Sequence, residues 1–269
     1  MRGASADSLA RLTEALGSAV DGGADAVRVA DDLFAVAEVL RREPSLRRTL
    51  TQLSITPDGK ADLARQLFTG QLDGAALDLV TLAVRQRWAA IRDLADALEH
   101  LGIVAVVQGA DRAGRADLLE NELFGFGRIV TDNPGLRDAL SDPARSHQDK
   151  RALLHGLLEG RADTATIRLA EQSVVGSHRT VSVAIEEYQK IAAAHRHRLV
   201  ATVHVASEMG AADQQRLAGA LARQYGRPVH LNVVVDPDVV GGVRVEIGDD
   251  VIDGTVASRL DDARRRLAG

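Results

Sequence analysis

An internal repeat with a period of 90 residues constrains the fold of this 269-residue chain more than any other feature. Residues 33–50, LFAVAEVLRREPSLRRTL, align without a gap on residues 123–140, LFGFGRIVTDNPGLRDAL. The same offset carries KADLARQLFTG, from Lys60, onto KRALLHGLLEG, from Lys150. Because the register is held over a long stretch and includes a proline and a glycine, the sequence indicates a duplication.

Each copy has the apolar spacing of helices. From Leu33 to Leu40 apolar residues recur at i, i+3, i+4 and i+7, and Pro44 ends the pattern, since a helix interior rejects proline. Further short apolar periods follow, separated by Gly-rich or Gln/Arg-rich breaks. We therefore predict a compact helical bundle made twice, the first in residues 1–108 and the second in residues 109–198.

The period changes from 3.6 to 2 after residue 198. LVATVHVAS, VHLNVVV and VRVEI alternate as half-buried strands do, a helix lies between the first two, and Gly241 and Gly242 form a turn between the last two. A final helix is expected over 256–267. Residues 199–269 are thus predicted to form a small α/β domain, so the fold class is mainly α, with a duplicated N-terminal helical bundle followed by that domain.

Composition excludes several classes of function. The net charge of -5 gives no general attraction to nucleic acid or to an anionic bilayer, and 3% aromatic residues leave little for base stacking. The absence of Cys excludes disulfides and thiolate metal sites. The longest stretch without a charged residue or His, 101–110, is far shorter than the about 20 residues of a membrane span. We expect neither a nucleic-acid partner nor a membrane span.

The most specific motif lies over 229–260, where VHLNVVVDPDVVGGVRVEIGDDVIDGTVASRL closely resembles the C-terminal signature of the delta subunit of F-type ATP synthases, related to the mitochondrial oligomycin-sensitivity-conferring protein. The helical part resembles the six-helix bundle of the same family, including AVRQRW at 83–88. The signature positions are Asp236, Gly241, Gly242, Gly248, Asp249, Asp253, Gly254, Arg259 and Leu260.

This resemblance implies a non-catalytic stator subunit without a cofactor. Its helical bundle would grip N-terminal segments of the alpha subunits in the catalytic head of alpha and beta subunits, and its C-terminal domain would hold the b-type stalk subunits, at the cytoplasmic face of the bacterial membrane. The duplication resembles the longer actinobacterial form, which is either free-standing or fused behind a b-type subunit. Candidate partner-binding residues are Leu9, Leu12, Leu16, Leu79, Val84, Arg264 and Arg265.

Features typical of enzymes each have a simpler structural interpretation. The Gly-Phe-Gly sequence at 125–127 lacks the third glycine of a dinucleotide loop and lies within a predicted helix, where small residues indicate close helix packing. His204 and His230 fall on polar strand faces, with no carboxylate or Cys at ligand spacing. No catalytic residue and no metal site is expected.

An acidic cluster leaves a hydrolase as one alternative. Asp249, Asp250 and Asp253 could surround Mg²⁺, although a turn and a helix cap explain them better. A second alternative is a helical-repeat adaptor of another complex, which would explain the duplication but not the C-terminal signature. On the last helix, acidic residues four positions before Arg265 and Arg266 are consistent both with a self-paired, solvated face and with a stalk-binding face.

Overall fold

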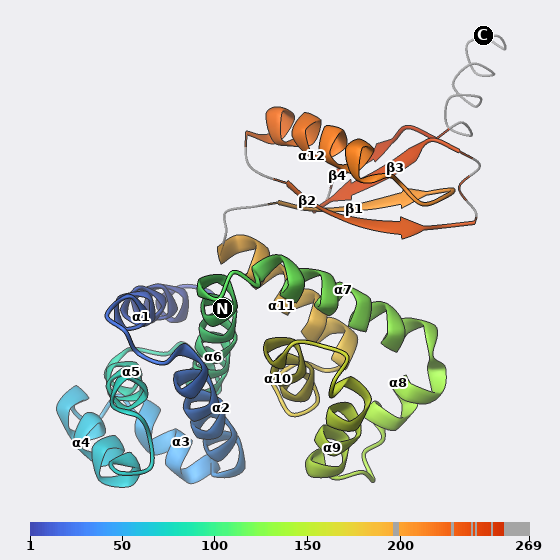
Figure 1. Ribbon diagram of the computed structural model, residues 1–269. Coiled ribbons are helices and arrows are strands. Elements are labelled where there is room, and N and C mark those ends of the chain that lie inside the picture. Colours follow the sequence, from blue (N-terminus) through green and yellow to red (C-terminus); the bar gives the residue numbers. More distant parts are fainter. Residues whose placement is uncertain (196–198, 227–228, 238, 240, 249, 256–269) are drawn as a thin grey trace, which may run out of the picture. The chain divides into compact units, whose positions relative to one another are not determined.

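The computed structural model describes residues 1–195, 199–226, 229–237, 239, 241–248 and 250–255. The chain divides into two compact units, Met1–Ile191 and Ala192–Gly269. Over the described residues the first unit is helical, and the second contains one further helix and a four-stranded sheet (Figure 1). The expected fold class, mainly helical with a small α/β part near the C-terminus, is confirmed.

Eleven helices precede the first strand within the described residues. They are α1 Ala4–Asp21, α2 Ala26–Arg42, α3 Pro44–Thr51, α4 Pro57–Phe68, α5 Gly74–Arg85, α6 Asp93–Arg112, α7 Ala116–Asp132, α8 Pro134–Ser141, α9 His147–Leu158, α10 Thr164–Ser173 and α11 Val181–His195. We call α1–α5 the first copy and α7–α11 the second copy.

The 90-residue period is repeated in the helix boundaries. The bounds of α2, α3 and α4, shifted by 90, coincide with those of α7, α8 and α9. The capping residues repeat as well: the side chain of Asp73 accepts a hydrogen bond from the first turn of α5, and that of Asp163 does the same for α10. Pro44 and Pro134 end one helix and occupy the first turn of the next, as a residue without an N–H donor can.

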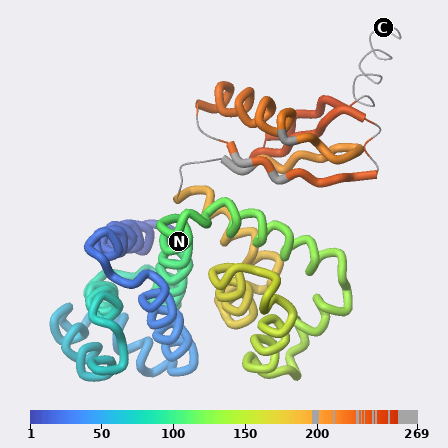
Figure 2. The backbone as a smooth tube through the Cα atoms, in the orientation of Figure 1, coloured from blue at the N-terminus to red at the C-terminus, as the bar shows by residue number. Residues whose placement is uncertain are grey.

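Helix α6 belongs to both copies. Shifting α1 by 90 gives 94–111, close to the bounds of α6, and shifting α6 in turn overlaps α11. The run Leu101–Val107 is buried throughout, as expected for a helix that is covered on every side. It packs most extensively on α2, and also on α1, α7 and α10 (Figure 2). The predicted division between residues 108 and 109 falls inside this helix.

The close packing of α2 on α6 depends on one glycine. A Cβ atom built on Gly102 would lie 2.5 Å from the ring of Phe34, so the two helix axes approach where position 102 has no side chain. The ring is 7% exposed and fills the space over the glycine.

The second unit is built on a mixed sheet with strand order β2-β1-β3-β4. Its elements are β1 Leu199–Val205, α12 Ala211–Tyr225, β2 Val229–Val235, β3 Val243–Ile247 and β4 Asp250–Asp253. β1 and β2 are parallel and joined by α12, while β3 pairs antiparallel with both β1 and β4. The core contains Ala201, Val203, Val205, Leu221, Val229, Val245 and Ile247.

The predicted glycine turn lies between β2 and β3, which are not neighbours in the sheet. Since β1 lies between these strands, the connection crosses the sheet and does not close a hairpin. Gly241 and Gly242 nevertheless have the positive φ values, 95° and 82°, that favour glycine. The tight hairpin of this unit joins β3 to β4, and Gly248, with φ of 58°, lies in it.

Gly242→Val should destabilise the second unit by about 2 kcal/mol, because a branched residue at positive φ is strained. A Cβ here would also lie 2.5 Å from the carbonyl oxygen of Gly254. Calorimetric melting of the full chain measures the effect. Gly219→Ala, inside α12 with only a side-chain end of Arg223 nearby, is the control and should be neutral or stabilising. An unchanged transition in Gly242→Val would contradict the expectation.

Candidate functional site

The second copy carries an apolar groove with a volume of about 640 Å³. It is bounded by α7, the start of α8, the end of α9 and the start of α10. Ile129 and Leu157 at its edge are 50% and 39% exposed, whereas Glu122 and Arg161 bring one charge of each sign to its lining. A groove of this size and chemistry suits the apolar side chains of an amphipathic partner helix.

Two residues that line the groove are smaller than their counterparts in the first copy. Leu158 occupies the position that Phe68 has in the first copy, where the Phe ring is only 7% exposed. Gly125 replaces Ala35, and a Cβ at this glycine would meet nothing within 4 Å, so it lines open space. The substitution is not uniform, since Phe126 and Ile129, which also line the groove, are larger than Val36 and Val39.

The glycines at 125–127 therefore have two roles. The interpretation as close helix packing holds for Gly127, where a Cβ would lie 3.4 Å from Ile185 on α11. It is wrong for Gly125, which faces the groove. Both glycines lie within α7, where no strand precedes them as a dinucleotide loop requires.

The apolar candidates for partner binding lie mainly in the core of the first copy. Leu12, Leu16 and Val84 are 0% exposed and Leu79 is 3% exposed, so these side chains pack the bundle. Leu9 on α1 is half-buried and is the member of this set that reaches the surface. Arg264 and Arg265 lie outside the described residues, as do the predicted last helix and the charge pairs on it.

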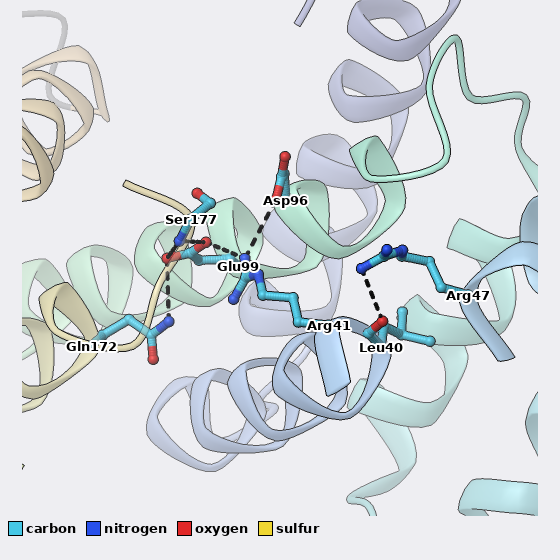
Figure 3. Close-up of polar contacts among 7 residues, drawn as sticks. All are labelled: Leu40, Arg41, Arg47, Asp96, Glu99, Gln172 and Ser177. Carbon is cyan, nitrogen blue, oxygen red and sulfur yellow. Dashed lines mark hydrogen bonds and ion pairs between the residues drawn. The ribbon is translucent and has the colours of Figure 1, made fainter. Parts of the chain in front are cut away.

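A buried carboxylate joins the two copies. Glu99 on α6 is 1% exposed and forms an ion pair with Arg41 of α2 (Figure 3). From the second copy, Gln172 Nε2 donates to it at 3.2 Å and the backbone N–H of Ser177 donates at 2.9 Å. Arg41 lies 3.5 Å from Asp96 as well, and burial raises the pKa of that carboxyl.

Two further ion pairs run directly between the copies. Arg168 on α10 contacts Asp31 on α2 through two nitrogens, at 2.5 and 3.0 Å. Arg151 on α9 lies 3.2 Å from Glu38 on α2. A cavity of about 250 Å³ is lined by the residues of both ion pairs. We call the contacts of Glu99, Asp31 and Glu38 with the second copy the junction.

Sequence reasoning did not identify the junction. Asp96 and Glu99 are three residues apart on one face of α6 and are separated by apolar residues, which is the signal that would have pointed to a buried ion pair. Gly176 was also overlooked: a Cβ there would lie 1.9 Å from Glu99 Oε1, so only glycine leaves room for the carboxylate. Its counterpart in the first copy is Gln86.

Asp236, Gly241, Gly242, Asp253 and Gly254 of the signature lie at one end of the sheet, and Gly248 lies at the other end, in the turn between β3 and β4. The Asp236 amide donates to the Val205 carbonyl at 2.8 Å, and the Gly254 amide donates to the Val243 carbonyl at 2.9 Å. Asp253 accepts hydrogen bonds from the backbone and hydroxyl of Thr255, which hold its pKa below the ordinary value. These contacts give the signature a structural explanation. Asp249, Arg259 and Leu260 lie outside the described residues.

The sheet face opposite α12 carries polar and charged side chains. His204 Nδ1 lies 3.5 Å from Asp236, and Arg244 pairs with Glu246 at 2.8 Å. His230 is opposite Val200 in the strand register, four residues along the strand from His204. The side chain of His230 lies outside the described residues.

Among the described residues, no group of three or more His, Asp or Glu side chains is placed to hold a metal ion. Within the same part of the chain, no helix is long and apolar enough to cross a bilayer. Asp250 of the acidic cluster is the first residue of β4, and the hydroxyl of Tyr225 lies 3.3 Å from its carboxylate.

Comparison with known proteins identifies relatives over the full chain. Residues 104–267 match the family model described as ATP synthase delta (OSCP) subunit. ATP synthase subunit delta of a Nocardioides species is 53% identical over 100% of this chain and 98% of its own, and that of Streptomyces avermitilis is 47% identical over 99% and 98%. A chain of the Toxoplasma gondii mitochondrial ATP synthase hexamer matches 62% of this chain and 95% of its own, at 18% identity and a TM-score of 0.34.

Proposed function

The chain belongs to the ATP synthase delta (OSCP) subunit family, whose members are non-catalytic stator components of F-type ATP synthases, and from this we propose a division of labour between its parts. The second copy binds an N-terminal segment of an alpha subunit in its apolar groove. The second unit binds the b subunits. The chain thereby prevents the catalytic head from turning with the rotor during proton-driven ATP synthesis.

The position of the family match supports this division. Delta (OSCP) subunits generally contact the alpha and b subunits, and the match begins at residue 104. Residues 1–103, including α1–α5, precede it. The region that corresponds to the family model therefore contains the second copy and the sheet, and the groove lies in that region.

The chemistry of the groove favours an amphipathic helix as its occupant. Its apolar lining has the exposed side chains Ile129 and Leu157 on opposite walls, α7 and α9, so anchors one or two turns apart can enter from solvent. Glu122 and Arg161 can pair with charges that flank those anchors. The same proposal assigns Leu9 and the surface of α1 to a second contact with the head, and Arg264 and Arg265 to the b subunits.

A pair of substitutions tests the groove. Ile129→Asp with Leu157→Asp should weaken binding of a labelled alpha-subunit N-terminal peptide about 10-fold or more, since each loses the burial of an aliphatic side chain and places a charge in an apolar site. Fluorescence titration measures the affinity, and circular dichroism checks the fold.

The duplication supplies a matched control. Val39 and Leu67 occupy the equivalent positions of the first copy and are each 38% exposed. Val39→Asp with Leu67→Asp should leave peptide affinity unchanged. If this control loses binding while the groove variant retains it, the first copy is the receptor and the proposal is wrong.

A further inference from the structure

We propose that the two helical copies form a single rigid body, and that the ion pairs and hydrogen bonds of the junction fix their mutual orientation. This inference concerns the mechanics of the first unit and holds or fails independently of which surface binds the alpha subunits.

The first step in the argument is the position of Glu99. Its carboxylate forms an ion pair with Arg41 of the first copy and accepts two hydrogen bonds from the second copy. Its helix, α6, packs on both copies. A carboxylate that is 1% exposed is stable only where its charge is paired and its oxygens accept hydrogen bonds. Each copy supplies part of that requirement, so any relative rotation leaves a buried charge incompletely bonded.

The second step is that the charges of the junction occur only once. At the equivalent positions of the other copy, the acidic residues of α2 are replaced by a neutral and a basic residue, and the arginines of α9 and α10 by a small and an acidic residue. Asp31 and Glu38 correspond to Asn121 and Arg128. Arg151 and Arg168 correspond to Ala61 and Asp78.

This asymmetry has a consequence for assembly. Two similar copies that dock through different faces make a head-to-tail contact, which could in principle continue from chain to chain. In the register of the junction, Asn121 of one chain would face Asp78 of the next and Arg128 would face Ala61, so a further copy would form neither ion pair. The junction therefore favours the intrachain contact over self-association.

Distance measurement between the copies tests the rigid arrangement. The chain has no Cys, so spin labels can be attached to Cys introduced at exposed Ser18 on α1 and exposed Gln148 on α9 of the full-length protein. Double electron–electron resonance should give one narrow distribution of distances between the two labels. Asp31→Arg and Arg168→Asp should each increase the width of this distribution by about twofold or more. The variant that combines both substitutions restores opposite charges and should make the distribution narrow again.

A matched variant controls for general loss of charge. Asp58→Arg disrupts a comparable surface pair with Arg85 that lies within the first copy, and it should leave the distribution unchanged. A broad distribution in the unsubstituted chain would overturn the proposal. So would a narrow distribution that persists in both single reversals and in Glu99→Gln, because the orientation would then be set by apolar packing alone.

Discussion

Glu99→Ala should lower the free energy of unfolding of the helical unit by about 3 kcal/mol. The substitution leaves the guanidinium of Arg41, 21% exposed, with only the more distant Asp96. It also removes the acceptor for Gln172 Nε2 and for the Ser177 amide in a buried site. Urea denaturation followed by circular dichroism gives the change directly.

Two other variants separate this effect from a loss of surface charge. Glu99→Gln keeps an oxygen that can accept a hydrogen bond, so it should lower the free energy of unfolding by about half as much as Glu99→Ala does. Asp62→Ala removes the partner of Arg65 in an exposed pair within α4 and should cost less than about 0.5 kcal/mol. If Glu99→Ala costs no more than Asp62→Ala, the buried network does not stabilise the unit as we infer.

Removal of residues 199–269 should abolish binding to the b-subunit ends and preserve binding to the catalytic head. The helical unit, Met1–Ile191, has its own buried core, from Leu12 in α1 to Tyr188 in α11, so we expect it to fold without the sheet. Two pull-down experiments, against the head complex and against a soluble b fragment, measure the two activities, with the full-length chain as control.

The truncated chain has two informative alternative outcomes. Loss of head binding with retention of the b fragment would mean that the partners are assigned to the wrong units. An unfolded truncated chain, detected by circular dichroism, would mean that the helical unit depends on the sheet for its stability.

The sequence allowed the helices to be predicted because their signals are local. Apolar spacing and the prolines at 44 and 134 locate the ends of α2, α3, α7 and α8, and alternation from Leu199 to Val205 predicts β1. The repeat adds long-range information, since it predicts that one arrangement of helices occurs twice.

Strand order and helix sharing could not be obtained in this way. The position of β1 between β2 and β3 depends on which strands pair. The Gly-Gly turn is compatible with several pairings. Helix α6 could be assigned to both copies only once its contacts with α2 and α10 were known. The predicted boundary between residues 108 and 109 lies within this helix.

The candidate site was harder to predict than the fold. The groove is lined by residues of α7, α8, α9 and α10, and the helical period of each segment does not report how the helices pack around it. Leu12 and Leu16 satisfy the spacing expected of a partner-binding face, yet the same spacing is required of a core face, and both are buried. Burial decides between the two roles, and it depends on tertiary packing.

Proton-driven ATP synthesis, measured beside ATP hydrolysis in the same membrane vesicles, tests the stator role most directly. Vesicles whose synthase lacks this subunit are supplied with either the full-length chain or the chain without residues 199–269. The full-length chain should restore synthesis, whereas the truncated chain should leave hydrolysis active and synthesis absent, because a head that is not held can turn with the rotor. Restoration of synthesis by the truncated chain to the full-length level would contradict the account.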